Sequence, residues 1–225
     1  MKLIEQLKGK LLIILDLDDT ILATIDFFYD LAVSVCDELS LNIFPKEQLK
    51  HFWGQPLNDI LLALAQKNKW SREDTQRFIK LFRQKLDTNI VPLIPDAARV
   101  LKNLKEEGFI LTLLTNRSKK NLEPLDDHGL NNGFFYIIVC KDTYPGKKTR
   151  KPNPEVMNLI LKGFGFSTDK IIFVGDSAKF DLPVAQAQGI DFLAVTTGAS
   201  NEGDFTKKNL PKENILPSIA SLLED

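Results

Sequence analysis

The chain has 225 residues, of which 44% are hydrophobic and 26% charged, so it can bury a full core. Its 29 basic and 30 acidic residues give a formal net charge of -1, which provides no field for a polyanion and argues against a nucleic-acid partner. The two cysteines, Cys36 and Cys140, form no Cys-x-x-Cys pair, and no apolar run reaches the ~20 residues of a membrane helix. These features predict a globular cytoplasmic protein with no membrane partner.

Short apolar runs, each bounded by turn or helix signals, predict buried parallel strands. They are Leu11–Leu15, Ile110–Leu114, Phe135–Val139, Ile171–Val174 and Phe192–Val195. Helical segments alternate with them: Pro95–Glu107 before a stop at Gly108, a helix opened by Asn153 and Pro154, Leu182–Gln188, and a last helix at Pro217–Leu223. This alternation predicts an α/β fold with a doubly wound parallel sheet.

The interval between the first two predicted strands is far longer than an ordinary crossover connection. It contains four predicted helices: Thr24–Ser40, Lys46–Trp53, Leu57–Lys67 and Ser71–Asn89, the last opened by a capping pattern at Ser71 and Asp74. We therefore expect an α/β core made of residues 1–22 and 91–225, with a small all-helical domain, residues 23–90, inserted after the first strand.

Acidic residues follow the first predicted strand in the segment Asp16-Leu17-Asp18-Asp19-Thr20. In an extended chain, Asp16 and Asp18 point the same way, so two carboxylates share one small volume. Such like charges need a bound cation or a raised pKa. The alternative is that these residues merely close a strand and cap a helix.

A second acidic segment follows the predicted strand Ile171–Val174 and contains Gly175, Asp176 and Asp181. Carboxyl ends of neighbouring strands meet at one edge of an open α/β sheet, where ligands bind. Together the two segments predict a site of oxygen ligands suited to Mg²⁺. For Asp181 the alternative is a helix cap.

Two further segments complete a predicted phosphate site. Thr115 and Asn116 end the second predicted strand and offer a hydroxyl and backbone N–H groups near the following helix. Lys151 precedes another helix, where its ammonium can reach a phosphate oxygen. The alternative is a solvated basic loop that includes Lys147, Lys148 and Arg150.

These segments, in this order at strand ends, resemble the motifs of the haloacid dehalogenase superfamily. Asp16-x-Asp18-x-Thr20 is similar to the first motif and Thr115 to the second. Lys151 is similar to the third, and Gly175-Asp176 with Asp181 to the fourth. The position of the helical insert resembles the cap of the subgroup of phosphoglycolate phosphatases and β-phosphoglucomutases. Within the subgroup, Gly54-Gln55-Pro56-Leu57 is similar to a cap segment and Thr196-Thr197-Gly198 to the usual end of the last strand.

The resemblance implies a Mg²⁺-dependent phosphatase acting on a small phosphorylated metabolite. In it Asp16 would be the nucleophile that forms an aspartyl-phosphate, and Asp18 the general acid and base. Asp16, the Asp18 backbone carbonyl and Asp176 would hold the metal, with Asp181 behind them. The phosphate would be bound by Thr115, the Asn116 backbone and Lys151.

Two alternatives to hydrolysis remain open at this stage. A phosphosugar mutase of the β-phosphoglucomutase kind uses the same aspartyl-phosphate, and the motifs do not separate it from a phosphatase. A non-catalytic, receiver-like regulatory domain also gathers aspartates at strand ends, although Asp18, Thr115 and Lys151 argue against it. Substrate identity depends on cap contacts that residue spacing leaves open.

Overall fold

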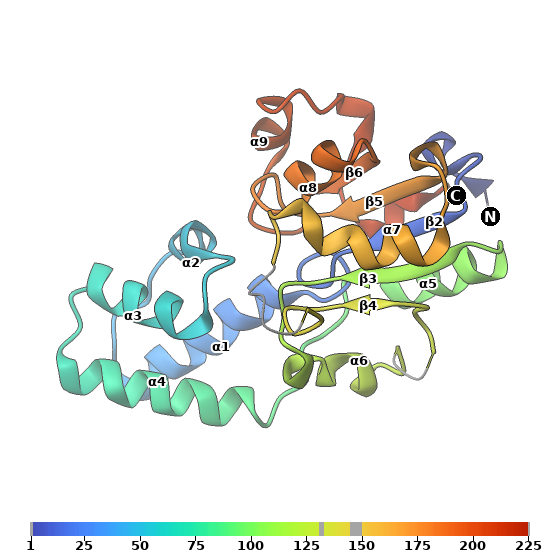
Figure 1. The fold of residues 1–225 in the computed structure, drawn as a ribbon. Coiled ribbons are helices and arrows are strands. Elements are labelled where there is room, and N and C mark those ends of the chain that lie inside the picture. The colour runs from blue at the N-terminus through green and yellow to red at the C-terminus, as the bar shows by residue number, and fades with distance from the viewer. Residues whose placement is uncertain (1, 131–132, 145–149, 225) are drawn as a thin grey trace. The chain divides into compact units, whose positions relative to one another are not determined.

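The computed structural model describes residues 2–130, 133–144 and 150–224. The chain separates into two compact units, one made of Met1–Ala23 and Leu93–Asp225 and the other of Thr24–Pro92. We call the first the α/β unit and the second the helical unit; Figure 1 labels their elements. In the described ranges, no helix combines the length and apolar character needed to cross a bilayer.

The α/β unit is built on a six-stranded parallel sheet in the order β4-β3-β2-β5-β6-β7, of which Figure 1 labels β2 to β6. The strands are β2 (Leu12–Leu15), β3 (Ile110–Leu114), β4 (Ile138–Val139), β5 (Ile171–Gly175), β6 (Asp191–Val195) and β7 (Ile215–Leu216). From β2 the chain proceeds outward to β3 and β4 on one side, and later to β5, β6 and β7 on the other. The carboxyl end of β2 is thus the switch point of the sheet. The predicted α/β class and doubly wound sheet are confirmed.

Helices cover the sheet and explain why its strands are apolar throughout. They are α5 (Ala97–Glu106), α6 (Glu123–Asp127), α7 (Asn158–Phe164), α8 (Asp181–Gln188) and α9 (Glu202–Thr206). Leu12 and Ile14 belong to one buried cluster with residues of α7 and α8. The intervening Ile13 and Leu15 are equally buried and, by strand alternation, point to the opposite face. Because both faces are covered, the strands carry no polar alternation.

The ends of the chain differ from the sequence prediction. Instead of a helix over Pro217–Leu223, the chain forms a 3-10 turn, Ile219–Leu222, and then β8 (Leu223–Glu224), which pairs antiparallel with β1 (Lys2–Leu3). Strand β7, just before, was not predicted. Pro217 and Ser218 divide this segment into two short apolar runs, and pairing with strands distant in the sequence decides their conformation.

Two predicted strands have different limits in the structure. The first begins at Leu12 rather than Leu11, and the predicted strand Phe135–Val139 is reduced to β4. Backbone pairing with β3 nevertheless starts earlier, because the Tyr136 N–H donates to the Leu111 carbonyl at 3.0 Å. Short edge strands have fewer ladder bonds, so their limits are poorly defined by sequence.

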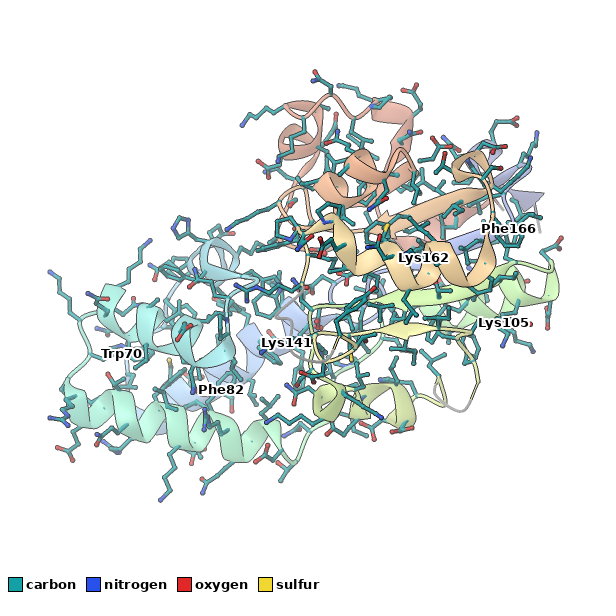
Figure 2. All side chains as sticks on the ribbon, viewed as in Figure 1. Trp70, Phe82, Lys105, Lys141, Lys162 and Phe166 are labelled. Carbon is teal, nitrogen blue, oxygen red and sulfur yellow. The ribbon has the colours of Figure 1, made fainter. Side chains whose placement is uncertain are left out.

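The helical unit contains α1 (Thr24–Leu39), α2 (Lys46–Phe52), α3 (Leu57–Lys67) and α4 (Arg72–Leu86). Helix α4 begins after Ser71, whose side chain accepts a hydrogen bond from the Asp74 N–H at 3.0 Å, as expected for an N-cap. Phe78 and Phe82 are buried, and the Phe78 ring lies 4.7 Å from Trp70. Figure 2 labels Trp70 and Phe82 in this unit. Aromatic packing thus provides it with a core of its own.

Candidate active site

The first acidic segment follows β2 directly. The Asp16 N–H donates to the Val174 carbonyl at 3.0 Å, which extends the β2–β5 pairing by one residue. Leu17 is fully buried, and its carbonyl accepts hydrogen bonds from the N–H groups of Ile21 and Leu22, each at 3.0 Å. The strand therefore ends in a tight turn that keeps Asp16 buried, 6% exposed, at the carboxyl end of β2.

The second acidic segment lies beside the first because β2 and β5 pair in register, Leu15 beside Val174. Carboxylate oxygens of Asp16, Asp176 and Asp181 lie within 4.8 Å of one another, and all three residues are buried. We call these three residues the acidic cluster. Converging carboxylate oxygens are the ligands that hard divalent cations prefer. The cluster could therefore hold a metal ion.

Two glycines leave room for these carboxylates. A Cβ atom on Gly175 would lie 2.6 Å from Oδ2 of Asp181, and one on Gly198 would lie 1.7 Å from Oδ2 of Asp176. The neighbouring Ala199 N–H donates to the same Asp176 oxygen at 3.4 Å. The segment after β6 thus approaches Asp176 so closely that a side chain at position 198 would displace the carboxylate.

Lys151 is a buried cation in contact with the acidic cluster. It is 3% exposed, and its ammonium forms ion pairs with Asp16 and with Asp181, the latter at 2.7 Å. A solvated environment is therefore wrong for Lys151, while Lys147 and Lys148 lie outside the described residues. Asp181 is the first residue of α8, whose N-cap is Phe180, and its carboxylate also accepts a hydrogen bond from the Ser177 N–H at 3.0 Å.

Thr115 and Asn116 follow β3 and connect it to the segment of Lys151. The Asn116 Nδ2 donates to the Lys151 carbonyl at 3.1 Å, and its Oδ1 accepts from the Lys151 N–H at 2.8 Å. Thr115 is 3% exposed, and its hydroxyl oxygen accepts from the Arg117 N–H at 3.1 Å. The Asn116 side chain thus fixes the backbone of Lys151, a contact that the sequence did not indicate.

Asp18 is not among the three residues of the acidic cluster, and its carboxylate is bound by Arg117. Arg117 Nη2 donates to Oδ1 of Asp18 at 2.6 Å, and Nε donates to Oδ1 and Oδ2 at 3.0 Å each. The motifs do not single out Arg117. Its position directly after Thr115 and Asn116 was the available signal, but a basic residue in a loop does not reveal its partner.

Burial and like charges raise carboxyl pKa values in the acidic cluster. Burial raises the pKa of Asp16 to about 7, despite the opposing effect of Lys151. Burial and repulsion by Asp181 likewise raise the pKa of Asp176. Burial opposes the charge of Lys151, but attraction by Asp16 and Asp181 outweighs it and raises the pKa of Lys151. Three carboxylates and one ammonium together carry a net negative charge, which one divalent cation would balance.

Residues 13–195 match the model of a family described as haloacid dehalogenase-like hydrolases. The chain belongs to this family. The resemblance predicted from the motifs is confirmed, and so is the enzyme class of hydrolase. The match includes every predicted site residue, from Asp16 to Asp181.

Curated relatives and solved structures support the assignment to the haloacid dehalogenase-like hydrolases. The chain is 31% identical to a phosphoglycolate phosphatase of Aliivibrio fischeri over 212 residues, 89% of each chain. It is 28% identical to one of Vibrio cholerae over 97% of both chains. A predicted phosphoglycolate phosphatase of Haemophilus somnus has a similar structure, with a TM-score of 0.71 at 21% identity over 96% of this chain and 97% of that one. A β-phosphoglucomutase candidate of Thermotoga maritima gives 0.70 at 17% identity, over 95% of this chain and 96% of that one. Both solved structures have the same fold.

Proposed function

We propose that this haloacid dehalogenase-like hydrolase is a Mg²⁺-dependent phosphatase that hydrolyses a small phosphate monoester, as phosphoglycolate phosphatases do. The observation that carries the proposal is the convergence of Asp16, Asp176 and Asp181 with Lys151 at the carboxyl ends of β2 and β5. Its relatives at 31% and 28% identity are named phosphoglycolate phosphatases, which supports phosphoglycolate as the first substrate to test.

The residues present fit a divalent cation, because the acidic cluster offers buried oxygen ligands and its three carboxylates outnumber the one ammonium, that of Lys151, paired with them. In the proposal Asp16, the backbone carbonyl of Asp18 and Asp176 hold Mg²⁺, and Asp181 supports them from behind. When bound, the ion supplies charge that offsets the repulsion between an anionic nucleophile and an anionic substrate.

In the proposed mechanism, a carboxylate oxygen of Asp16 attacks phosphorus while the bond from phosphorus to the leaving oxygen breaks. Asp18 donates a proton to that leaving oxygen, and an aspartyl-phosphate remains on Asp16. Asp18 then takes a proton from water, whose oxygen attacks phosphorus as the bond from phosphorus to the Asp16 oxygen breaks, which releases inorganic phosphate and restores the Asp16 carboxylate. Lys151, the Thr115 hydroxyl and the Asn116 N–H stabilise charge on the phosphoryl oxygens, where each well-placed donor contributes about 3 kcal/mol.

We also propose that the helical unit, residues 24–92, serves as a cap that limits access to small substrates. Its place in the chain, between β2 and β3, supports this role, because caps of the phosphoglycolate phosphatase subgroup are inserted there. The substrate class that follows is a small phosphorylated metabolite. A cytoplasmic location stays a prediction from the sequence.

The alternatives to hydrolysis are less favoured. A phosphomutase would share the aspartyl-phosphate, but the mutase-like neighbour is only 17% identical and supports the fold alone. A non-catalytic receiver-like domain does not fit a chain that belongs to a family of hydrolases.

The test is phosphate release from a panel of small phosphomonoesters, 2-phosphoglycolate and hexose phosphates among them, with Mg²⁺ or with EDTA. We expect Mg²⁺-dependent release that Asp16→Asn abolishes. Asp127→Asn, which changes an exposed aspartate on α6, is the matched control and should keep full activity. Absence of release across the panel, or release that EDTA and Asp16→Asn leave intact, would refute the proposal.

A further inference from the structure

Arg117, just after β3, is held by hydrogen bonds of both its backbone and its side chain. Its backbone N–H donates to the Thr115 hydroxyl oxygen at 3.1 Å, and its carbonyl accepts from the Lys141 N–H at 2.9 Å. Its Nη1 donates to the Asn121 carbonyl at 3.1 Å. The remaining guanidinium nitrogens, Nε and Nη2, point at Asp18. Arg117 is therefore anchored independently of the carboxylate that it binds.

The contact between the guanidinium and Asp18 fixes an orientation rather than merely pairing two charges. Both carboxylate oxygens of Asp18 accept from Arg117, at 2.6 to 3.0 Å, which determines the plane of the carboxylate. The side chain of Asp18 is 26% exposed and that of Arg117 is 14% exposed, so solvent screens the pair less than it screens a surface ion pair. The Arg117 side chain thus holds the Asp18 carboxylate by both of its oxygens.

The acidic loop creates a need for such a partner. Asp16 lies two residues before Asp18, Asp19 follows it directly, and Asp19 is buried at 1% exposure. Without a fixed cation, repulsion among these carboxylates would favour rotation of the more exposed Asp18 toward solvent. Proton transfer requires that the donor lie within hydrogen-bond distance of the acceptor, so a rotated Asp18 could no longer act as the general acid and base.

We propose that Arg117 is a positioning residue that acts through Asp18: it holds the carboxylate in the orientation needed for proton transfer to the leaving oxygen and from water. The inference rests on the proposed function, since it concerns the same reaction. In this scheme Arg117 acts on the reaction through Asp18.

The experiment is a double-mutant cycle of Arg117→Met and Asp18→Ala, with kcat and KM measured for the best substrate of the panel. Arg117→Met should lower kcat by about 10- to 100-fold, as misplacement of a reacting group by ~1 Å does, and leave KM unchanged. In the Asp18→Ala background the same change should have no further effect on kcat. Arg117→Lys should restore part of the activity, because an ammonium keeps the charge but not the two-nitrogen contact.

Lys119→Met is the matched control, because it removes a basic and exposed side chain two residues away. It should leave both constants unchanged. Circular dichroism and thermal unfolding will establish that each variant is folded, and Arg117→Gln replaces Arg117→Met in the cycle if the latter does not fold.

The outcomes separate the two hypotheses. If the wild-type protein releases no phosphate, the proposed function fails. If the wild type is active and Asp18→Ala is slow, but the losses in kcat from the two substitutions multiply in the double mutant, Arg117 acts independently of Asp18 and the inference is overturned. A raised KM in Arg117→Met would mean direct contact with substrate, and a raised kcat would mean that the ion pair restrains Asp18; each of these also overturns it.

Discussion

The contact between Gly198 and Asp176 allows a sharp test of the site geometry. In Gly198→Ala the new Cβ would lie 1.7 Å from Asp176 Oδ2 and 2.5 Å from its Cγ. Non-bonded heavy atoms rest at about 3.5 Å, so the carboxylate or the segment after β6 must move by roughly 2 Å. Rotation of Asp176 would remove it from the acidic cluster, whereas movement of the backbone would strain the end of β6.

Both responses have measurable costs. Misplacement of a reacting group by ~1 Å can lower a rate about 100-fold, so we expect at least that loss in kcat, together with weaker Mg²⁺ binding. Overpacking of a buried site lowers the free energy of unfolding by about 1–3 kcal/mol. Steady-state kinetics, calorimetric Mg²⁺ titration and urea unfolding measure the three quantities.

Two controls isolate the steric cause. Gly163→Ala places its Cβ 3.2 Å from Ile137 Cδ1, the movable end of a side chain, and should leave Mg²⁺ binding unchanged. In an Asp176→Ala background the two closest contacts, with Oδ2 and Cγ, are absent and only the 2.8 Å contact with Cβ remains, so Gly198→Ala should reduce stability by less than it does in the wild type. The reasoning is refuted if Gly198→Ala binds Mg²⁺ and turns over substrate as the wild type does.

Three further predictions concern protonation, the Lys151 segment and the helical unit. Since the pKa of metal-free Asp16 is raised to about 7, protons compete with Mg²⁺. Because the pKa of Asp176 is raised as well, Mg²⁺ affinity should rise with pH, by up to about tenfold per pH unit for each of the two carboxyl groups that loses its proton, and a flat calorimetric profile would contradict this. The same shift means that the native metal-free protein binds the Asp16 proton more tightly than the unfolded chain does. Protonated Asp16 therefore stabilises the native state fully below pH 3.8, and this stabilisation is lost as the pH rises to about 7. Urea unfolding in EDTA at several pH values measures it. Asn116→Ala removes both hydrogen bonds to the Lys151 backbone and should lower kcat by about tenfold or more and the free energy of unfolding by about 1–3 kcal/mol, whereas Asn103→Ala, at a half-exposed position on α5, should lower neither. Phe78→Ala, at a fully buried ring, should lower the free energy of unfolding by about 3–5 kcal/mol, and Ile90→Ala, at a side chain 58% exposed, by much less.

The main elements of the fold could be read from local pattern. Strands β3, β5 and β6 lie within a residue of their predicted limits, because burial on both faces requires uninterrupted apolar runs. Helix α3 spans Leu57–Lys67 as predicted, since its apolar spacing has a helical period. The acidic residues at the ends of β2 and β5 could be predicted for a related reason: parallel strands bring their carboxyl ends to one edge.

Other features depended on chain segments far apart in the sequence. Strands β7 and β8 are too short for a periodic signal, and their pairing partners determine them. Asp181, expected behind the metal ligands, contributes an oxygen to the acidic cluster because Gly175 leaves space for it. Whether it ligates an ion stays a prediction.

The sequence by itself therefore determined which residues are acidic, basic and apolar, in what order, and at which strand ends. Only the tertiary structure decided their partners: Arg117 binds Asp18 across 99 positions, and Asn116 binds the Lys151 backbone across 35. The physical reason is that periodicity and capping act within a few turns of chain, whereas ion pairs and side-chain hydrogen bonds depend on distances that exist only once the sheet has assembled.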